Sequence, residues 1–264
     1  MVNAFLLLSP IGMIIVGLAA IIFWKREKKT AWRYFGYGAL LWTLAIIPKL
    51  AMDFTITPYI YNGLYAYGTA ALLTGAGLYL GLRTGFFESG FTYIAGRRIK
   101  RLKKIKLDDA IAFGIGFGGF EAIAIGISAF LSMAAFVIDP SLASLLTTQQ
   151  QAALDSPTIV VGAAILERVF AIFIHVFSSL LVFYSIAKKK IIYLAYSTIF
   201  KAAVDGIIPG LTFYIDTTTV AGTYLLELPF LALAFISWLG IVWLMGRYPS
   251  EHPRNMKKAN KRKK

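Results

Sequence analysis

Long apolar runs, separated by short polar or charged breaks, dominate the pattern of this chain. A helix needs about 20 predominantly apolar residues to cross a hydrocarbon core of about 30 Å. The runs between the breaks predict transmembrane helices at residues 4–24, 34–52, 62–86, 109–137, 158–187, 191–215 and 221–246. We therefore expect an all-α, polytopic membrane protein, built as a bundle of about seven transmembrane helices.

The composition agrees with a membrane protein. Of the 264 residues, 58% are hydrophobic and only 15% are charged, whereas a soluble domain carries roughly a quarter charged residues. The chain has no cysteine, which excludes disulfides and thiolate metal sites. Of its two histidines, only His175 lies in an apolar run, so a metal site in the membrane would have a single imidazole.

Basic residues are distributed asymmetrically. All but three of the 27 lysines and arginines fall in four clusters, at 25–33, 83–106, 188–190 and 247–264. With seven spans, these clusters lie on one side of the membrane, and the connections on the other side contain no lysine or arginine. Short cytoplasmic loops collect positive charge, so the N-terminus is expected outside and the C-terminus in the cytoplasm.

The net charge of +14 follows from this topology. The basic residues near the membrane surface would attract anionic headgroups, so the lipid bilayer is the expected partner and nucleic acid is not. No linker or repeat divides the chain. We expect a single transmembrane domain, 1–264, ending in a short basic cytoplasmic tail, 247–264.

Ionisable residues also occur inside the apolar runs. An ionised group at the centre of a bilayer costs several kcal/mol or more, so such residues face the bundle interior and find partners. We expect one polar pocket among segments 109–137, 158–187 and 191–215. The residues that would form it are Glu121, Glu167, Arg168, His175, Lys201 and Asp205.

Helical spacing predicts some of the partners. Lys201 and Asp205 are four residues apart, so they share a helix face and are expected to pair directly. Lys49 precedes Asp53 by four residues and is expected to reach the membrane surface as an exposed pair. Glu227 lies near the start of segment 221–246 and is expected at the interface.

Small residues recur every four positions in segment 109–137. Gly114, Gly118, Ala122 and Gly126 form a stripe that allows another helix to approach closely. Glu121 borders this stripe and would lie near a tight helix contact. Further along, Pro209 is expected to kink segment 191–215 just beyond Asp205.

Three motifs in order carry a family resemblance: GIGFGGFEA, then ERVFAIFIH, then an acid late in the next segment. Over most of its length the chain resembles the YhfC family of intramembrane metalloproteases, which is related to the PrsW proteases and the CAAX prenyl endopeptidases. The resemblance implies Glu121 as general base, with His175 and Asp205 as further catalytic residues. It also implies a divalent metal such as zinc, held by His175, Asp205 and Glu121, and a supporting role for Glu167 and Arg168.

The third motif departs from the family pattern. The family has a histidine four residues before the acid, whereas this chain has Lys201. A protonated ammonium has no lone pair to give to a metal. We therefore expect an ion pair of Lys201 and Asp205 where the family has metal ligands.

Three functions stay open at this point. The preferred hypothesis is a catalytically degenerate relative without cofactor, which binds other membrane proteins or serves as a subunit of a complex. The first alternative is an active intramembrane peptidase acting on a transmembrane substrate through Glu121, His175 and Asp205. The second is an ion or solute transporter using the polar pocket. In each case we expect a multi-pass protein of the cytoplasmic membrane of a prokaryote.

Overall fold

The computed structural model describes residues 2–249, and these contain helices and no strand. Most of the expected tail, from 250 onwards, lies outside the described residues. The elements, including short 3-10 helices (η1, η3, η4) and a π-helix (η2), are η1 (Ala4–Leu7), α1 (Leu8–Lys28), α2 (Trp32–Thr55), α3 (Thr57–Tyr65), α4 (Thr69–Thr84), η2 (Gly85–Ser89), α5 (Gly90–Arg98), α6 (Leu107–Ile138), η3 (Pro140–Leu145), α7 (Thr148–Leu154), η4 (Thr158–Val160), α8 (Val161–Lys188), α9 (Ile192–Gly206), α10 (Ile208–Tyr214) and α11 (Val220–Met245).

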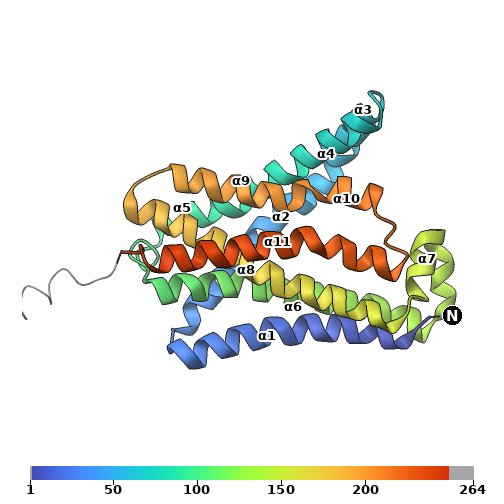
Figure 1. Cartoon of the computed structure of the whole chain (residues 1–264), viewed down its shortest axis with the longest axis horizontal. Coiled ribbons are helices and arrows are strands. Elements are labelled where there is room, and N and C mark those ends of the chain that lie inside the picture. Colours follow the sequence, from blue (N-terminus) through green and yellow to red (C-terminus); the bar gives the residue numbers. More distant parts are fainter. Residues whose placement is uncertain (1, 250–264) are drawn as a thin grey trace, which may run out of the picture.

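Five helical stretches are long and apolar enough to cross a membrane. They are Ala4–Lys28, Trp32–Thr55, Leu107–Ile138, Thr158–Lys188 and Val220–Met245. The other two expected spans are each broken into shorter helices; α9 and α10 run along the bundle, whereas α3 and α4 project obliquely from it (Figure 1). The all-helical membrane bundle is thus confirmed, whereas seven crossings and the orientation of the termini stay predictions.

The segment expected at 62–86 differs most from the prediction. A turn after α3 interrupts it, and α4 continues without a break through η2 into α5, ending at Arg98. The sequence GFFESG looked like the start of a polar loop, but Glu88 and Ser89 are buried inside the protein. Burial against partners on other helices keeps this polar stretch helical.

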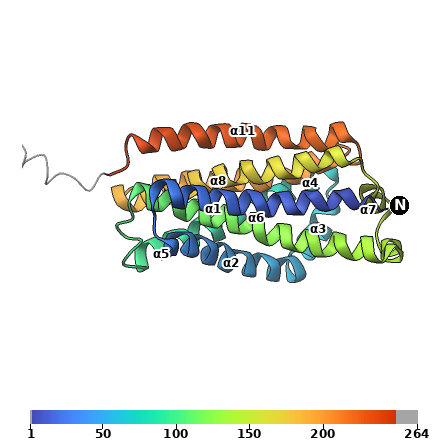
Figure 2. The ribbon, with the colours of Figure 1, turned by 90° about the horizontal axis from the view of Figure 1, so that it is seen from below.

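Helix α6 lies at the centre and packs against α1, α2 and α8. Figure 2 shows α1 and α6 side by side, with α11 on the other side of α8. The glycines of α6 make this possible: a Cβ on Gly114 would meet Val176 of α8, and one on Gly126 would meet Pro10 of α1. The predicted role of the small-residue stripe in close packing is therefore confirmed.

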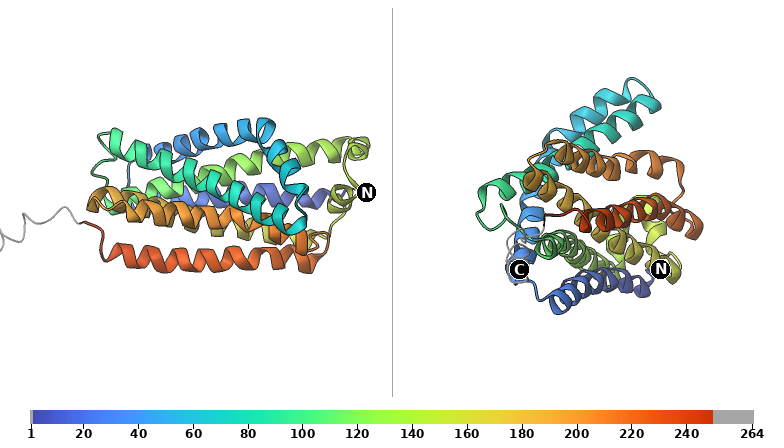
Figure 3. Two further views of the ribbon diagram at one scale, coloured as in Figure 1. Left: turned by 90° about the horizontal axis from the view of Figure 1, so that it is seen from above. Right: turned by 60° about the vertical axis from the view of Figure 1, so that its left-hand side comes forward.

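A second stripe of glycines joins α4 to α9, which lie side by side in Figure 3. Gly77, Gly81 and Gly85 recur every four residues along the α4–η2 helix. Added Cβ atoms would meet backbone atoms of Gly206, Ala202 and Thr198, which recur every four residues on α9. The two backbones therefore approach closely, and this contact brings η2 beside the middle of α9.

Helix α9 ends at Gly206, and α10 begins at Ile208 with Pro209 in its first turn. Proline lacks an N–H and clashes with the preceding turn, so it favours a helix start. The break falls just beyond Asp205, where the kink was predicted. The connections 29–31, 99–106 and 189–191 and the end of α11 all lie at one end of the bundle, with the N-terminus at the other (Figure 1).

Candidate functional site

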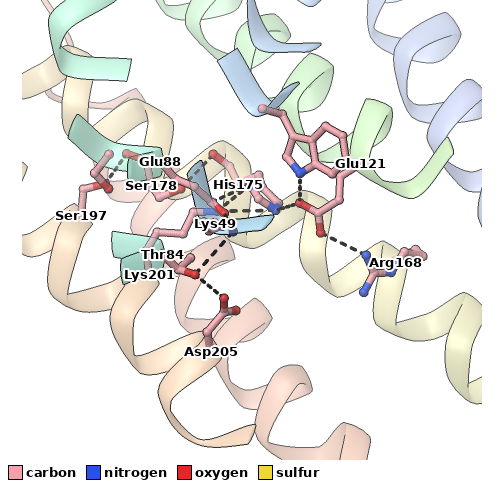
Figure 4. A network of polar contacts seen from close by, with 12 residues as sticks. Lys49, Thr84, Glu88, Glu121, Arg168, His175, Ser178, Ser197, Lys201 and Asp205 are labelled. Carbon is pink, nitrogen blue, oxygen red and sulfur yellow. Dashed lines mark hydrogen bonds and ion pairs between the residues drawn. The ribbon is translucent and has the colours of Figure 1, made fainter. Parts of the chain in front are cut away.

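A cavity of about 240 Å³ lies among α2, α4, η2, α6, α8, α9 and α11. All six ionisable residues expected in a shared pocket line it. The structure adds Lys49, Thr84 and Glu88 to the lining. Figure 4 shows that the labelled side chains of this set, which do not include Glu167, point toward one another from different helices. The expected clustering is found, whereas the catalytic and metal-binding roles stay predictions.

Glu121 of α6 and His175 of α8 are in direct contact. The imidazole Nε2 lies 2.9 Å from Oε2 of the carboxylate. Helix α6 presents Gly118 to the His175 side chain, so no Cβ separates the two helices there. The ring of Phe117 stacks on the imidazole with centroids 4.9 Å apart, which fixes the ring plane.

Glu121 accepts two further hydrogen bonds. The indole Nε1 of Trp42 donates to Oε2 at 2.7 Å, and Nη1 of Arg168 donates to Oε1 at 3.0 Å. Arg168 also pairs with its neighbour Glu167, and the supporting role expected for both stays a prediction. Three donors therefore surround the carboxylate that the resemblance nominates as general base.

Lys201 is 4% exposed and lies at the centre of the cluster. Its Nζ is 2.6 Å from Oε2 of Glu88 and 2.5 Å from Nδ1 of His175, and it lies over the ring of Phe117. An ammonium can only donate, so Nδ1 is the acceptor and the imidazole proton resides on Nε2. Nε2 then donates to Glu121, and a continuous polar chain links Glu88 to Glu121.

The predicted direct pair between Lys201 and Asp205 is wrong. Asp205 instead accepts a hydrogen bond from the hydroxyl of Thr84, across the α4–α9 contact. The side chain of Lys201 turns toward η2 because Glu88 offers a fully buried carboxylate there. Two residues on the same face of a helix can form an ion pair. Their spacing does not decide whether one of them pairs instead with a nearer residue on another helix.

The expected surface pair of Lys49 and Asp53 is also wrong. Lys49 is 8% exposed and donates to Glu88 at 2.8 Å and to Thr84 at 3.4 Å. Asp53 pairs with Arg83 of α4 instead. The long aliphatic stem of Lys49 thus carries its ammonium into the bundle rather than out to the surface.

Glu88 is the residue that sequence reasoning missed. It is 5% exposed and receives both Lys49 and Lys201. Glu88 lies just beyond the expected span 62–86 and shortly before the basic residues of 97–106, so the sequence placed it in a loop. The repeat of Gly77, Gly81 and Gly85 was the signal that the helix continues to it.

Two further residues, Glu227 and Ser178, lie near the ion cluster. Glu227 does not line the cavity, but it is buried, and its Oε2 lacks a hydrogen-bond partner among the described residues. Its expected place outside the pocket is found, and its position at the membrane interface stays a prediction. On α8, Ser178 donates to the backbone oxygen of His175.

The site combines a helical membrane bundle with a carboxylate–imidazole contact in a buried cavity. The sequence model of the YhfC intramembrane metalloprotease family matches residues 12–228. The chain belongs to this family. No curated protein and no solved structure matches it.

The family description implies a metal, and the residues present test whether one fits. Within residues 2–249, no three or more His, Cys, Asp or Glu side chains are arranged to hold a metal ion. Both nitrogens of His175 are engaged, and the ammonium of Lys201 lies against one of them. Asp205 is bonded to Thr84. A ligand set whose one imidazole faces an ammonium does not fit a divalent cation.

Proposed function

We propose that this chain is a family member without metallopeptidase activity and that it works as a membrane protein that binds other membrane proteins. The observation that carries the proposal is the place of the Lys201 ammonium, 2.5 Å from His175 and 2.6 Å from Glu88. A positive charge fixed there repels a divalent cation and supplies the charge that would neutralise Glu88. The cluster is built to hold helices together without a metal.

The state of Glu121 supports the proposal. Two carboxylate oxygens offer about four acceptor positions, and Trp42, Arg168 and His175 use three of them. A general base must accept a proton from a water molecule that is hydrogen-bonded to it. Because protein donors occupy most of its acceptor positions, Glu121 has little room to bind such a water molecule.

The partner-binding role draws on a second feature. An apolar groove of about 500 Å³ lies between α9 and α11, with residues of α8 as its floor. Tyr196 and Ile199 are exposed in it, and none of the charged side chains of residues 2–249 lines it. A transmembrane helix of another protein is the occupant that we propose, because apolar and aromatic side chains of α8, α9 and α11 line the groove.

A complementation experiment separates this proposal from an active peptidase. A strain lacking the gene would receive the wild-type chain, Glu121→Gln or Ile199→Trp, with protein abundance checked in each. Glutamine keeps the shape of Glu121 but cannot take up a proton. If Glu121→Gln restores the wild-type membrane proteome and Ile199→Trp, which fills the groove, does not, the binding role is supported. Failure of Glu121→Gln at normal abundance would contradict it.

One observation favours a second candidate, a metal-free hydrolase. The Glu121–His175 contact lines a cavity large enough for several water molecules, and Lys201 could stabilise a developing oxyanion. In that case, cleavage products that are present in the wild-type strain would be missing both from a Glu121→Gln strain and from a His175→Gln strain. Neither variant should alter the membrane proteome if the first proposal holds.

A further inference from the structure

A second cavity, remote from the ion cluster, lies at the end of the bundle where the basic connections gather. Its volume is about 610 Å³, and it is bounded by α5, the connection 99–106 and the turn between α8 and α9. Three cations line it, one from each segment: Arg97, Lys103 and Lys189. No carboxylate of residues 2–249 lines it, so the cavity has a net positive charge.

The lining of this cavity includes a buried hydroxyl group that has no hydrogen-bond partner among the described residues. Ser185 is 2% exposed, and its hydroxyl has no hydrogen-bond partner among the described residues. Buried hydroxyl groups nearly always have a partner, so an orphan needs an explanation. Ser185 lines the same cavity as the three cations. An anion with hydrogen-bond acceptors would satisfy the hydroxyl and neutralise the cations together.

Tyr93 adds a further donor. Arg97 donates to its hydroxyl oxygen at 3.3 Å, so the tyrosine proton stays free to point into the cavity. A guanidinium, two ammonium groups and two hydroxyls around one space match a tetrahedral oxyanion, because phosphate oxygens accept from such donors. Tyr93, Arg97 and Lys103 also line an adjoining hollow of about 560 Å³.

Apolar residues at the same site indicate the source of the phosphate. Ile191 lines the cavity and Ile94 lines the adjoining hollow, and they are 63% and 55% exposed. A free phosphate ion would leave these exposed isoleucine side chains in contact with water, which is unfavourable. The acyl chains below a lipid headgroup would cover them. Basic pockets between transmembrane helices are known to hold anionic lipid headgroups.

We propose that this cavity binds the phosphodiester headgroup of an anionic phospholipid. Arg97, Lys103 and Lys189 surround the phosphate, and the hydroxyls of Ser185 and Tyr93 donate to its oxygens. The acyl chains lie along Ile94 and Ile191. The site is independent of the ion cluster and of the proposed partner-binding role.

The test measures lipid binding to the purified full-length chain in a neutral detergent at about 0.15 M salt, where the Debye length is about 8 Å and loose surface attraction is screened. Soluble short-chain phosphatidylglycerol, short-chain phosphatidylcholine and inorganic phosphate are titrated separately. The pocket variant is Arg97→Gln/Lys103→Gln/Lys189→Gln. Its matched control, Lys100→Gln/Arg101→Gln/Lys104→Gln, removes the same charge from exposed residues that line neither hollow.

Phosphatidylglycerol is expected to bind the wild-type chain and the control at least about tenfold more tightly than it binds the pocket variant. Phosphatidylcholine and inorganic phosphate should bind far more weakly than phosphatidylglycerol. Equal losses in the two triple variants would overturn the proposal in favour of non-specific charge. Binding of inorganic phosphate as tight as that of the lipid would also overturn it.

Ser185→Ala keeps the proposal testable if the triple variant fails to fold. Removing an unsatisfied buried hydroxyl should leave the thermal stability of the lipid-free chain unchanged or raise it. Affinity for phosphatidylglycerol should nevertheless fall several-fold. Unchanged lipid affinity in Ser185→Ala would show that the hydroxyl does not contact the headgroup and would contradict the proposed geometry.

Discussion

Two ion pairs join α2 to the α4–η2 helix about one turn apart, and their environments differ. Lys49 on α2 pairs with Glu88, and both side chains are at most 10% exposed. Asp53, one turn further along α2, pairs with Arg83, and its carboxylate side chain is 40% exposed. The first pair is joined by Lys201 and His175 into a cluster, whereas Asp53 and Arg83 lie outside that cluster.

This difference decides what each pair contributes. The Arg83 side chain of the second pair is 9% exposed, but the Asp53 carboxylate keeps part of its solvation, so this pair contributes less than one that is buried on both sides. A buried pair cannot be broken without leaving a charge unpaired in a medium of low dielectric, which costs several kcal/mol. The central cluster therefore fixes the positions of η2, α8 and α9, and the Arg83–Asp53 pair adds little to them.

The largest effect is expected for Lys201→Met. The change leaves Glu88 with Lys49 alone and leaves Nδ1 of His175 without its donor. We expect the free energy of unfolding, measured by titration with a denaturing detergent, to fall by about 3–5 kcal/mol. Lys104→Met, at an exposed position, is the control and should change it by less than about 0.5 kcal/mol. A small loss for Lys201→Met would mean that Lys201 does not contribute to the stability of the fold through the cluster.

Combining Lys201→Met with Glu88→Gln sharpens the comparison. Glu88→Gln alone leaves the ammonium groups of both Lys49 and Lys201 without their carboxylate, whereas the double variant leaves only that of Lys49 in this state. We expect the double variant to be more stable than the sum of the single effects predicts by at least about 1 kcal/mol. Strict additivity would show that the 2.6 Å contact is not an energetic pair.

Gly81→Ala tests the contact that brings Glu88 to Lys201. The added Cβ would meet the carbonyl group of Ala202 on α9, so the helices must separate. We expect a loss of about 1–3 kcal/mol in the same titration. Gly36→Ala on α2 is the matched control, because nothing lies within 4 Å of its added Cβ. It should be neutral or stabilising by up to about 1 kcal/mol; equal effects at both glycines would argue against close α4–α9 packing.

The smallest effect is expected for Asp53→Asn. Asparagine keeps the size of the side chain and still accepts a hydrogen bond from Arg83. The free energy of unfolding should fall by no more than about 1 kcal/mol. A loss as large as that of Lys201→Met would contradict the distinction between the two pairs.

The sequence alone predicted much of this arrangement. Charges inside apolar runs stand out, so Glu121, His175, Lys201 and Asp205 were identified and do line one cavity. The partners were harder to predict, because helical spacing shows which residues share a face and not which neighbouring helix is nearer. Lys201 therefore pairs with Glu88 rather than with Asp205.

Glu88 escaped prediction for a different reason. A hydropathy window registers a polar, glycine-containing stretch as a break, whereas here the helix continues through it as a π-helix. The cause lies in tertiary contacts: close packing of α4 on α9 and two lysines from other helices stabilise the buried carboxylate. Neither contact can be read from local composition.

Metal binding by the full chain tests the central claim most directly. The protein would be purified without chelators, equilibrated with zinc, and its tightly bound zinc determined by elemental analysis alongside His175→Ala. The account predicts far less than one equivalent of zinc and no difference between the two proteins, because the Lys201 ammonium holds the position that a cation would need. One equivalent of zinc that is lost in His175→Ala would contradict it.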